Sequence, residues 1–241
     1  MALPDTTRLR SFLFSRDPEV ISLVTQAQES LNIDVYPCGA AHEAVQTLTR
    51  ERFDAIIVDN ADSSGAVAVL SAAKDLPSCE QSIGIVLATS LSSIGLAEGA
   101  RSHMVIYRPL SLDRLRNGIK SALGLRSVGA DERESERASA SIPATLRGVG
   151  LEGTLAFITN ISAGGAALSV GQFIPPSCIQ SIEFSLPDTN ENLSVGIELV
   201  WRDVQGRMGV RFAGMSEEAT RSLQAWLGTH PALQRASQAS A

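Results

Sequence analysis

Between residues 8 and 125 the sequence alternates five times between a short apolar run and an amphipathic stretch. The apolar runs predict strands, and the amphipathic stretches predict helices because their apolar residues recur at helical spacing. The run Ala55–Asp59 is apolar until its terminal acid, as expected for a central strand buried on both faces. Strands that alternate with helices form a parallel sheet with helices on both faces, so this region predicts a doubly wound, five-stranded α/β fold.

The predicted elements follow from these runs. The strands are expected at Leu9–Phe14, 33–36, Ala55–Asp59, Ile83–Ala88 and Met104–Tyr107, and the helices at 18–30, Ala41–Arg50, 66–74, 94–100 and 112–123.

Composition limits the function classes. A chain of 241 residues is long enough for two domains, and its net charge of −6 argues against a general nucleic-acid binder, which needs a basic face. The cysteines Cys38, Cys79 and Cys178 lie far apart without metal-ligand spacing, so we expect free thiols in a reducing compartment. We find neither a signal peptide pattern nor an apolar run long enough to span a bilayer, so we expect a cytoplasmic protein without membrane insertion.

Catalysis finds no support in the sequence. The histidines His42, His103 and His230 form no metal-ligand pattern, and the chain has no nucleophile elbow and no phosphate loop containing lysine. We therefore expect a protein that is not an enzyme and that holds no cofactor and no metal.

The second half of the chain carries a candidate ligand site. Arg133 and Arg137 lie four residues apart in a charged stretch, and short β patterns follow at 142–146 and 154–159. The second pattern runs into the segment 160–165, which reads Asn-Ile-Ser-Ala-Gly-Gly. Arginine presents paired planar donors that suit phosphate oxygens and the O6/N7 edge of guanine.

The segment 160–165 offers complementary groups. Asn160 and Ser162 can pair with the donor edge of a base, while Gly164 and Gly165 let the backbone approach a ligand closely. Ile161 alternates with the polar pair, so we expect it to point into the core. The candidate ligand-binding residues are Arg133, Arg137, Asn160, Ser162, Gly164 and Gly165.

Arg-x-x-x-Arg, followed about two dozen residues later by Asp/Asn-x-Ser-x-x-Gly, resembles the signature of the PilZ family of bacterial cyclic di-GMP receptors. The resemblance covers residues 130–228 and continues through later strand patterns at 181–186, 193–201 and 209–212. It implies a six-stranded antiparallel β-barrel with a C-terminal helix, and cyclic di-GMP as the ligand of the six candidate residues. Asn160 stands where many members of the family have aspartate.

Two further features belong to this half. We interpret Trp201 and Phe212 as aromatics of the core or of the barrel end. A helix is expected to begin after Ser216, because serine is a good N-cap and acids follow it. Its buried stripe is predicted to contain Leu223, Trp226 and Leu227.

The first half, residues 8–125, resembles the receiver domain of bacterial response regulators. Asp59 falls at the family's phosphoacceptor position, and Arg108 stands where the family has lysine. The acidic pair that holds magnesium in the family is replaced by Ser15 and Arg16, so the resemblance implies a degenerate receiver. We expect Asp59 to be a carboxylate held by Arg16, Arg108 or backbone donors, with Arg16 as the substitute for the metal.

We predict a receiver-like domain at 1–125, a linker at 126–137, a PilZ barrel at 138–229 and a disordered tail at 230–241. The predicted function is a non-enzymatic receptor that binds cyclic di-GMP, changes its domain arrangement and signals to a protein partner, with the receiver-like domain as a candidate docking surface. Two alternatives are a response regulator triggered by phosphorylation of Asp59 and a ligand-independent adaptor. The sequence is also compatible with a homodimer.

Overall fold

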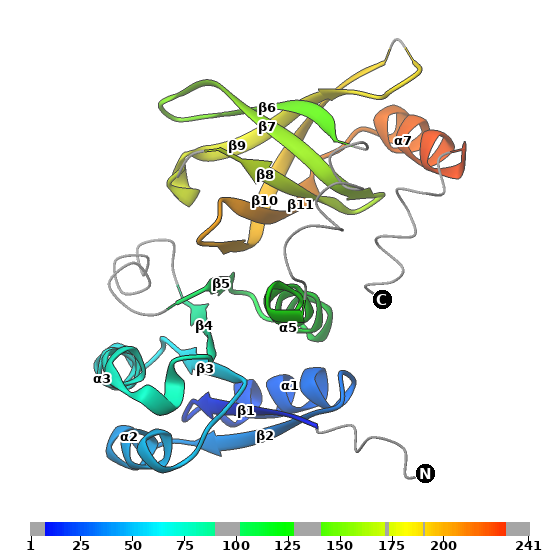
Figure 1. Cartoon of the computed structure of the whole chain (residues 1–241). Helices are drawn as coiled ribbons and strands as arrows, with labels where there is room; N and C mark the ends of the chain where they lie inside the picture. Colours follow the sequence, from blue (N-terminus) through cyan, green and yellow to red (C-terminus); the bar gives the residue numbers. More distant parts are fainter. Residues whose placement is uncertain (1–7, 90–101, 128–140, 172–173, 190, 230–241) are drawn as a thin grey trace. The chain divides into compact units, whose positions relative to one another are not determined.

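The computed structural model describes residues 8–89, 102–127, 141–171, 174–189 and 191–229. The chain divides into two compact units, Met1–Ser127 and Val128–Ala241 (Figure 1). Four predictions lie wholly or mostly outside the described residues: the linker at 126–137, the positions of Arg133 and Arg137, the helix at 94–100 and the disordered tail at 230–241.

The first unit has a receiver-like fold. Its described strands pair in parallel in the order β2-β1-β3-β4-β5, which is one of the two common orders of doubly wound sheets. Helix α1 packs against α5, and α2 packs against α3, on the two faces of the sheet (Figure 1). The elements are β1 Leu9–Phe14, α1 Pro18–Glu29, β2 Ile33–Cys38, α2 Ala41–Arg50, β3 Ala55–Asp59, α3 Ser63–Asp75, η1 Pro77–Cys79, β4 Ile83–Ala88, β5 Met104–Tyr107 and α5 Leu112–Ser127.

Local sequence explains where these elements begin and what they bury. Strands β3, β4 and β5 are buried along their whole length, which is why each is a continuous apolar run. Helix α1 begins with Pro18, and the side chain of the preceding Asp17 accepts the N–H of Glu19. Helix α3 begins after Asp62, whose side chain accepts the N–H of Gly65.

The second unit is a closed antiparallel barrel with a C-terminal helix, as the PilZ resemblance implied. Strand β6 pairs with β7 and β9, β8 pairs with β7 and β11, and β10 pairs with β9 and β11, so the ring of six described strands has no free edge. The elements are β6 Ile142–Gly148, β7 Leu151–Ser162, β8 Gly165–Val170, η3 Pro176–Cys178, β9 Ile179–Ser185, β10 Asn192–Asp203, β11 Arg207–Ala213 and α7 Glu217–Thr229.

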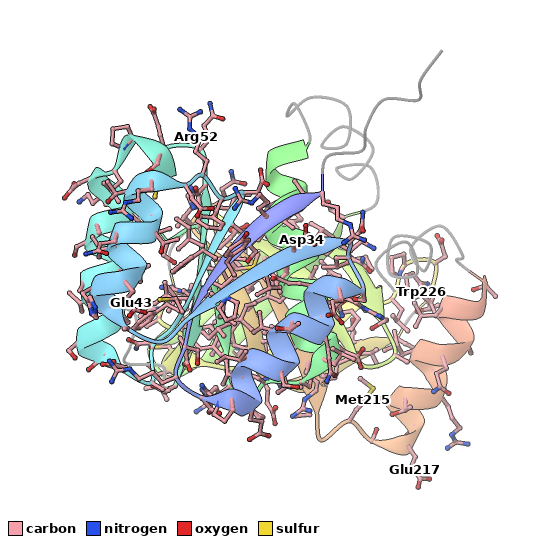
Figure 2. The ribbon with its side chains drawn as sticks, turned by 90° about the horizontal axis from the view of Figure 1, so that it is seen from below. Asp34, Glu43, Arg52, Met215, Glu217 and Trp226 are labelled. Atoms are coloured by element: carbon pink, nitrogen blue, oxygen red, sulfur yellow. The ribbon has the colours of Figure 1, made fainter. Side chains whose placement is uncertain are left out.

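Helix α7 contributes its apolar stripe to the barrel core. Leu223, Trp226 and Leu227 are all buried in the same cluster as the inward residues of the strands, as predicted. The indole N–H of Trp226 donates to the carbonyl of Pro187 at 2.9 Å, which ties the helix to the end of β9. Figure 2 labels Trp226 on α7, together with the exposed Glu217 in its first turn.

Two searches within the described residues were negative. None of the helices in the described part of the chain is long and apolar enough to cross a membrane. In the same ranges we find no group of three or more histidine, cysteine, aspartate or glutamate side chains that could hold a metal ion.

Candidate functional site

The carboxylate of Asp59 lies at the end of β3 and is 2% exposed. Arg108 Nη2 donates to Asp59 Oδ1 at 2.9 Å, and Ser15 Oγ donates to Asp59 Oδ2 at 2.9 Å. The N–H of Ala61 also donates to Oδ1, at 3.1 Å. Because β1, β3 and β5 are parallel, the residues after them share one edge of the sheet, and both oxygens of the candidate phosphoacceptor are engaged there.

Arg16 does not substitute for the metal, so that prediction is wrong. Its Nε donates to the carbonyl of Gly39 at 2.6 Å, and its Nη2 lies 3.5 Å from Asp62 Oδ2. Arg108 is instead the cation that pairs with Asp59. The long arginine side chain reaches from the end of β5 past β4 to the end of β3.

Asp62 combines the contact with Arg16 and the capping of α3. Its Oδ1 accepts the N–H of Gly65 at 3.1 Å and the hydroxyl of Ser64 at 3.0 Å. These hydrogen bonds, that of Gly65 first, and the nearby charge of Arg16 hold the pKa of Asp62 below its ordinary value.

The residues around Asp59 do not fit the magnesium ion of the receiver family. Magnesium needs hard oxygen ligands in near-octahedral order, and Ser15 supplies a hydroxyl where the family has a carboxylate. The guanidinium of Arg108 occupies Oδ1 of Asp59 and adds a positive charge next to the carboxylate. A divalent cation would therefore meet repulsion and too few anionic ligands.

The second candidate site lies on the barrel, at the end of β7. Ile161 is fully buried in the core, as predicted, so Asn160 and Ser162 on either side of it face outward. The register with β8 shifts between Ile158 and Asn160, which makes Thr159 the extra residue of a β-bulge. The bulge lets Ile158 and Ile161 both point into the core although they are three positions apart.

The turn after β7 is fixed by hydrogen bonds and packing. Ser162 Oγ donates to the carbonyl of Gly165 at 3.2 Å, and the N–H of Phe212 donates to the carbonyl of Gly164 at 2.9 Å. A Cβ at Gly165 would lie 2.3 Å from the carbonyl oxygen of Val210, so β8 can pack on β11 only with glycine here. The packing of β8 on β11 therefore requires glycine at position 165, independently of the expected approach of a ligand.

Two rows of outward residues cross β7, β8, β11 and β10, and we call their eight members the barrel face. The first row is Ser162, Gly165, Arg211 and Glu198, and the second is Asn160, Ala167, Gly209 and Trp201. Neighbouring strands lie about 4.8 Å apart, so each row spans about 14 Å. The positions of β8 in the two rows are the small residues Gly165 and Ala167, beside the polar end of β7.

Trp201 belongs to this face: it is partly buried near the end of β10 and lies outside the core cluster, which agrees with the barrel-end half of the interpretation. A Cβ at Gly209 would lie 2.2 Å from the indole Nε1, which places the ring of Trp201 across that glycine. The register of β10 with β11 shifts between Leu199 and Trp201, and this irregularity turns Trp201 outward. The signal in the sequence was the run 199–201 of three apolar residues, which breaks the alternation of a half-buried strand.

Phe212 does lie against the core. It is partly buried against the core cluster, and its ring stacks with that of Phe184 at a centroid distance of 6.4 Å.

The sequence pattern of the PilZ domain matches residues 131–228, a range that contains the two candidate arginines and all six strands of the barrel. Residues 131–228 are a PilZ domain. PilZ domains belong to a family of cyclic di-GMP receptors and are generally binding domains without enzyme activity. The six-stranded barrel with its C-terminal helix agrees with this assignment.

The N-terminal part resembles response regulator receiver domains. The chemotaxis response regulator CheY4 of Vibrio cholerae is 14% identical with a TM-score of 0.44, covering 48% of this chain and 99% of its own. A response regulator from Thermotoga maritima is 18% identical with a TM-score of 0.44, and the match covers 48% of this chain and 98% of the response regulator. The signal receiver domain of an HD domain-containing protein from Pseudomonas fluorescens Pf-5 is 17% identical with a TM-score of 0.45. This match covers 56% of this chain and 98% of the receiver domain.

No curated protein matches the chain.

Proposed function

We propose that this protein senses cyclic di-GMP with its PilZ domain. In this proposal Arg133 and Arg137 bind phosphates and the Hoogsteen edges of guanine, while Asn160 and Ser162 pair with a base above the Gly164–Gly165 turn. The observation that carries the proposal is the family match over residues 131–228, because it spans both halves of the motif. The barrel face supports it, since Asn160 and Ser162 both point outward beside the small residues Gly165 and Ala167.

The proposed output is a change of domain arrangement. The two arginines lie between the sheet of the first unit and the barrel of the second in the sequence, so a ligand that holds them acts at the junction of the two. A ligand shifts an equilibrium between arrangements only by the difference in its affinity for them. The arrangement in which the arginines and the barrel face bind the ligand together would therefore be favoured, and a protein partner would recognise it.

Calorimetric titration of cyclic di-GMP into the wild type, Arg137→Ala and Arg147→Ala tests the proposal. A hydrogen bond from a charged arginine is worth roughly 1.5–3 kcal/mol, so Arg137→Ala should weaken binding by about ten- to a hundredfold. Arg147 is the matched control, because it is an exposed arginine of the barrel paired with Glu183 at 2.6 Å and is no part of the motif. No binding by the wild type would overturn the sensor and favour the ligand-independent adaptor.

Phosphorylation of Asp59 is the rival trigger, and the geometry weighs against it. Both carboxylate oxygens are engaged by Ser15, Ala61 and Arg108, and the site does not fit magnesium. Incubation with acetyl phosphate and magnesium should give no incorporation that depends on Asp59. Stoichiometric incorporation of phosphate into the wild type that is lost in Asp59→Asn would instead support a response regulator triggered by phosphorylation.

A further inference from the structure

The barrel face contains a cation outside the recognised motif. Arg211 lies on β11 and is paired in register with Gly165 on β8, and Gly165 is in turn paired with Ser162 on β7. Because glycine has no side chain, no side chain of β8 stands between Arg211 and Ser162 in this row. Their Cα atoms are two strand spacings apart, or about 10 Å, which an arginine side chain and one phosphate group can bridge together.

Among the described residues, Arg211 forms an ion pair with Glu198. Its Nη2 is hydrogen-bonded to Glu198 Oε2, the next residue in the same row, on β10. The Arg211 and Glu198 side chains are 54% and 50% exposed. Exposed ion pairs of this kind contribute little to stability, so a competing anion can break the pair at small cost.

The charge of Glu198 opposes the binding of an anion beside Arg211. Glu198 neutralises Arg211, and its own carboxylate repels any phosphate that approaches the row. The chain carries a net charge of −6, so an anionic ligand depends on local cations.

We propose that Arg211 is a further phosphate-binding residue of the PilZ domain and that Glu198 competes with the ligand for it. The proposal rests on the proposed binding of cyclic di-GMP and extends the site across the barrel face, from the end of β7 to β10 and β11. Glu198 then sets the affinity, since ligand binding must displace it from Arg211.

The test is calorimetric titration of cyclic di-GMP into the wild type, Arg211→Gln, Glu198→Gln and the double variant. We expect Arg211→Gln to weaken binding about tenfold, as for a lost charged hydrogen bond, and Glu198→Gln to strengthen it about threefold. In the background of Arg211→Gln, removal of Glu198 should have a smaller effect, because the arginine for which it competes is absent. Both single effects should shrink at high salt, since the groups are exposed.

Arg147 and Glu183 provide matched controls. They form an exposed ion pair across β6 and β9, and their substitution by glutamine changes the net charge in the same way. We expect Arg147→Gln and Glu183→Gln to leave the affinity within about twofold of the wild type. Circular dichroism of each variant checks that the barrel is folded.

The outcomes separate the two proposals. Wild-type binding that weakens in Arg137→Ala but is unchanged in Arg211→Gln would overturn the role of Arg211 and leave the sensor intact. Weaker binding by Glu198→Gln would overturn competition and show that Glu198 positions the arginine. No binding by the wild type or by Glu198→Gln would overturn the sensor and this extension together.

Discussion

Asp59 is held by donors from three separate parts of the chain: the residues after β1, β3 and β5. The sequence placed Ser15, Arg16 and Arg108 at one edge of the sheet, because that follows from the strand order alone. It could not decide which arginine would reach the carboxylate. Arg16 is drawn away by the carbonyl of Gly39 and by Asp62, and these contacts depend on loop geometry that periodicity does not encode.

Arg108→Ala should destabilise the first unit by about 3 kcal/mol, because it leaves the buried carboxylate of Asp59 without its counter-ion. This value is at the lower end of the usual cost of breaking a buried ion pair, since 27% of the Arg108 side chain is exposed. Arg116→Ala is the matched control: the Arg116 side chain is about as exposed as that of Arg108, but its partner Asp113 is 83% exposed and lies 3.9 Å away, so loss of this pair should cost at most about 1 kcal/mol. Urea unfolding followed by circular dichroism measures both, and equal effects would refute the buried pair as a stabilising contact.

Asp62 should make the stability of the first unit depend on pH. Its pKa is lowered in the folded state, so its contribution is complete above the unfolded pKa of about 3.9 and is lost as the pH falls through the folded value. Asparagine still caps a helix but does not titrate. We therefore expect the wild type to be more stable than Asp62→Asn near pH 7, and the difference to disappear as the pH is lowered through this window. A difference in unfolding free energy that is constant with pH would contradict the shift.

At the scale of elements, most strands were predictable and the irregular ones were not. Strands β1, β3, β4 and β5 have the predicted bounds, because each is an apolar run with clear ends. Strand β7 runs from Leu151 to Ser162 rather than over 154–159 alone, since its glycine-containing start resembles a loop. The bulge in β7 and the irregularity in β10 shift the alternation by one residue, so a simple period of two does not tell which face of the barrel carries Trp201.

Helix α7 closes the barrel core, and its loss should unfold the second unit. Trp226→Ala should cost about 3–5 kcal/mol, because it removes a buried indole and leaves a cavity beside Leu223 and Leu227. Trp226→Phe keeps most of the buried area and loses the hydrogen bond to Pro187, so it should cost less, about 1–2 kcal/mol. Chemical unfolding of both variants measures the order, and a similar cost for the two would show that the hydrogen bond outweighs the packing.

For the whole molecule, the sequence predicted two units of different class, because the residue pattern changes from alternating strands and helices to consecutive strands followed by one helix. Each unit has its own buried core, so a ligand that binds one of them can change their arrangement without unfolding either. A sensor of the proposed kind requires this separation. A ligand-independent adaptor, in contrast, does not require a ligand that changes the arrangement of the two units.

Spin labels on the two units measure the proposed rearrangement. Glu43 on α2 and Glu217 on α7 are both exposed (Figure 2), so Glu43→Cys and Glu217→Cys can carry labels after the three native cysteines are replaced. We expect cyclic di-GMP to change or narrow the distance distribution between them in the wild-type background and not in Arg137→Ala, because the ligand favours only the arrangement that completes its site. A label pair at Asp34 and Glu43 within the first unit should stay unchanged. Saturating ligand that leaves the inter-unit distribution untouched would separate binding from signalling and show that the output lies in the PilZ domain itself.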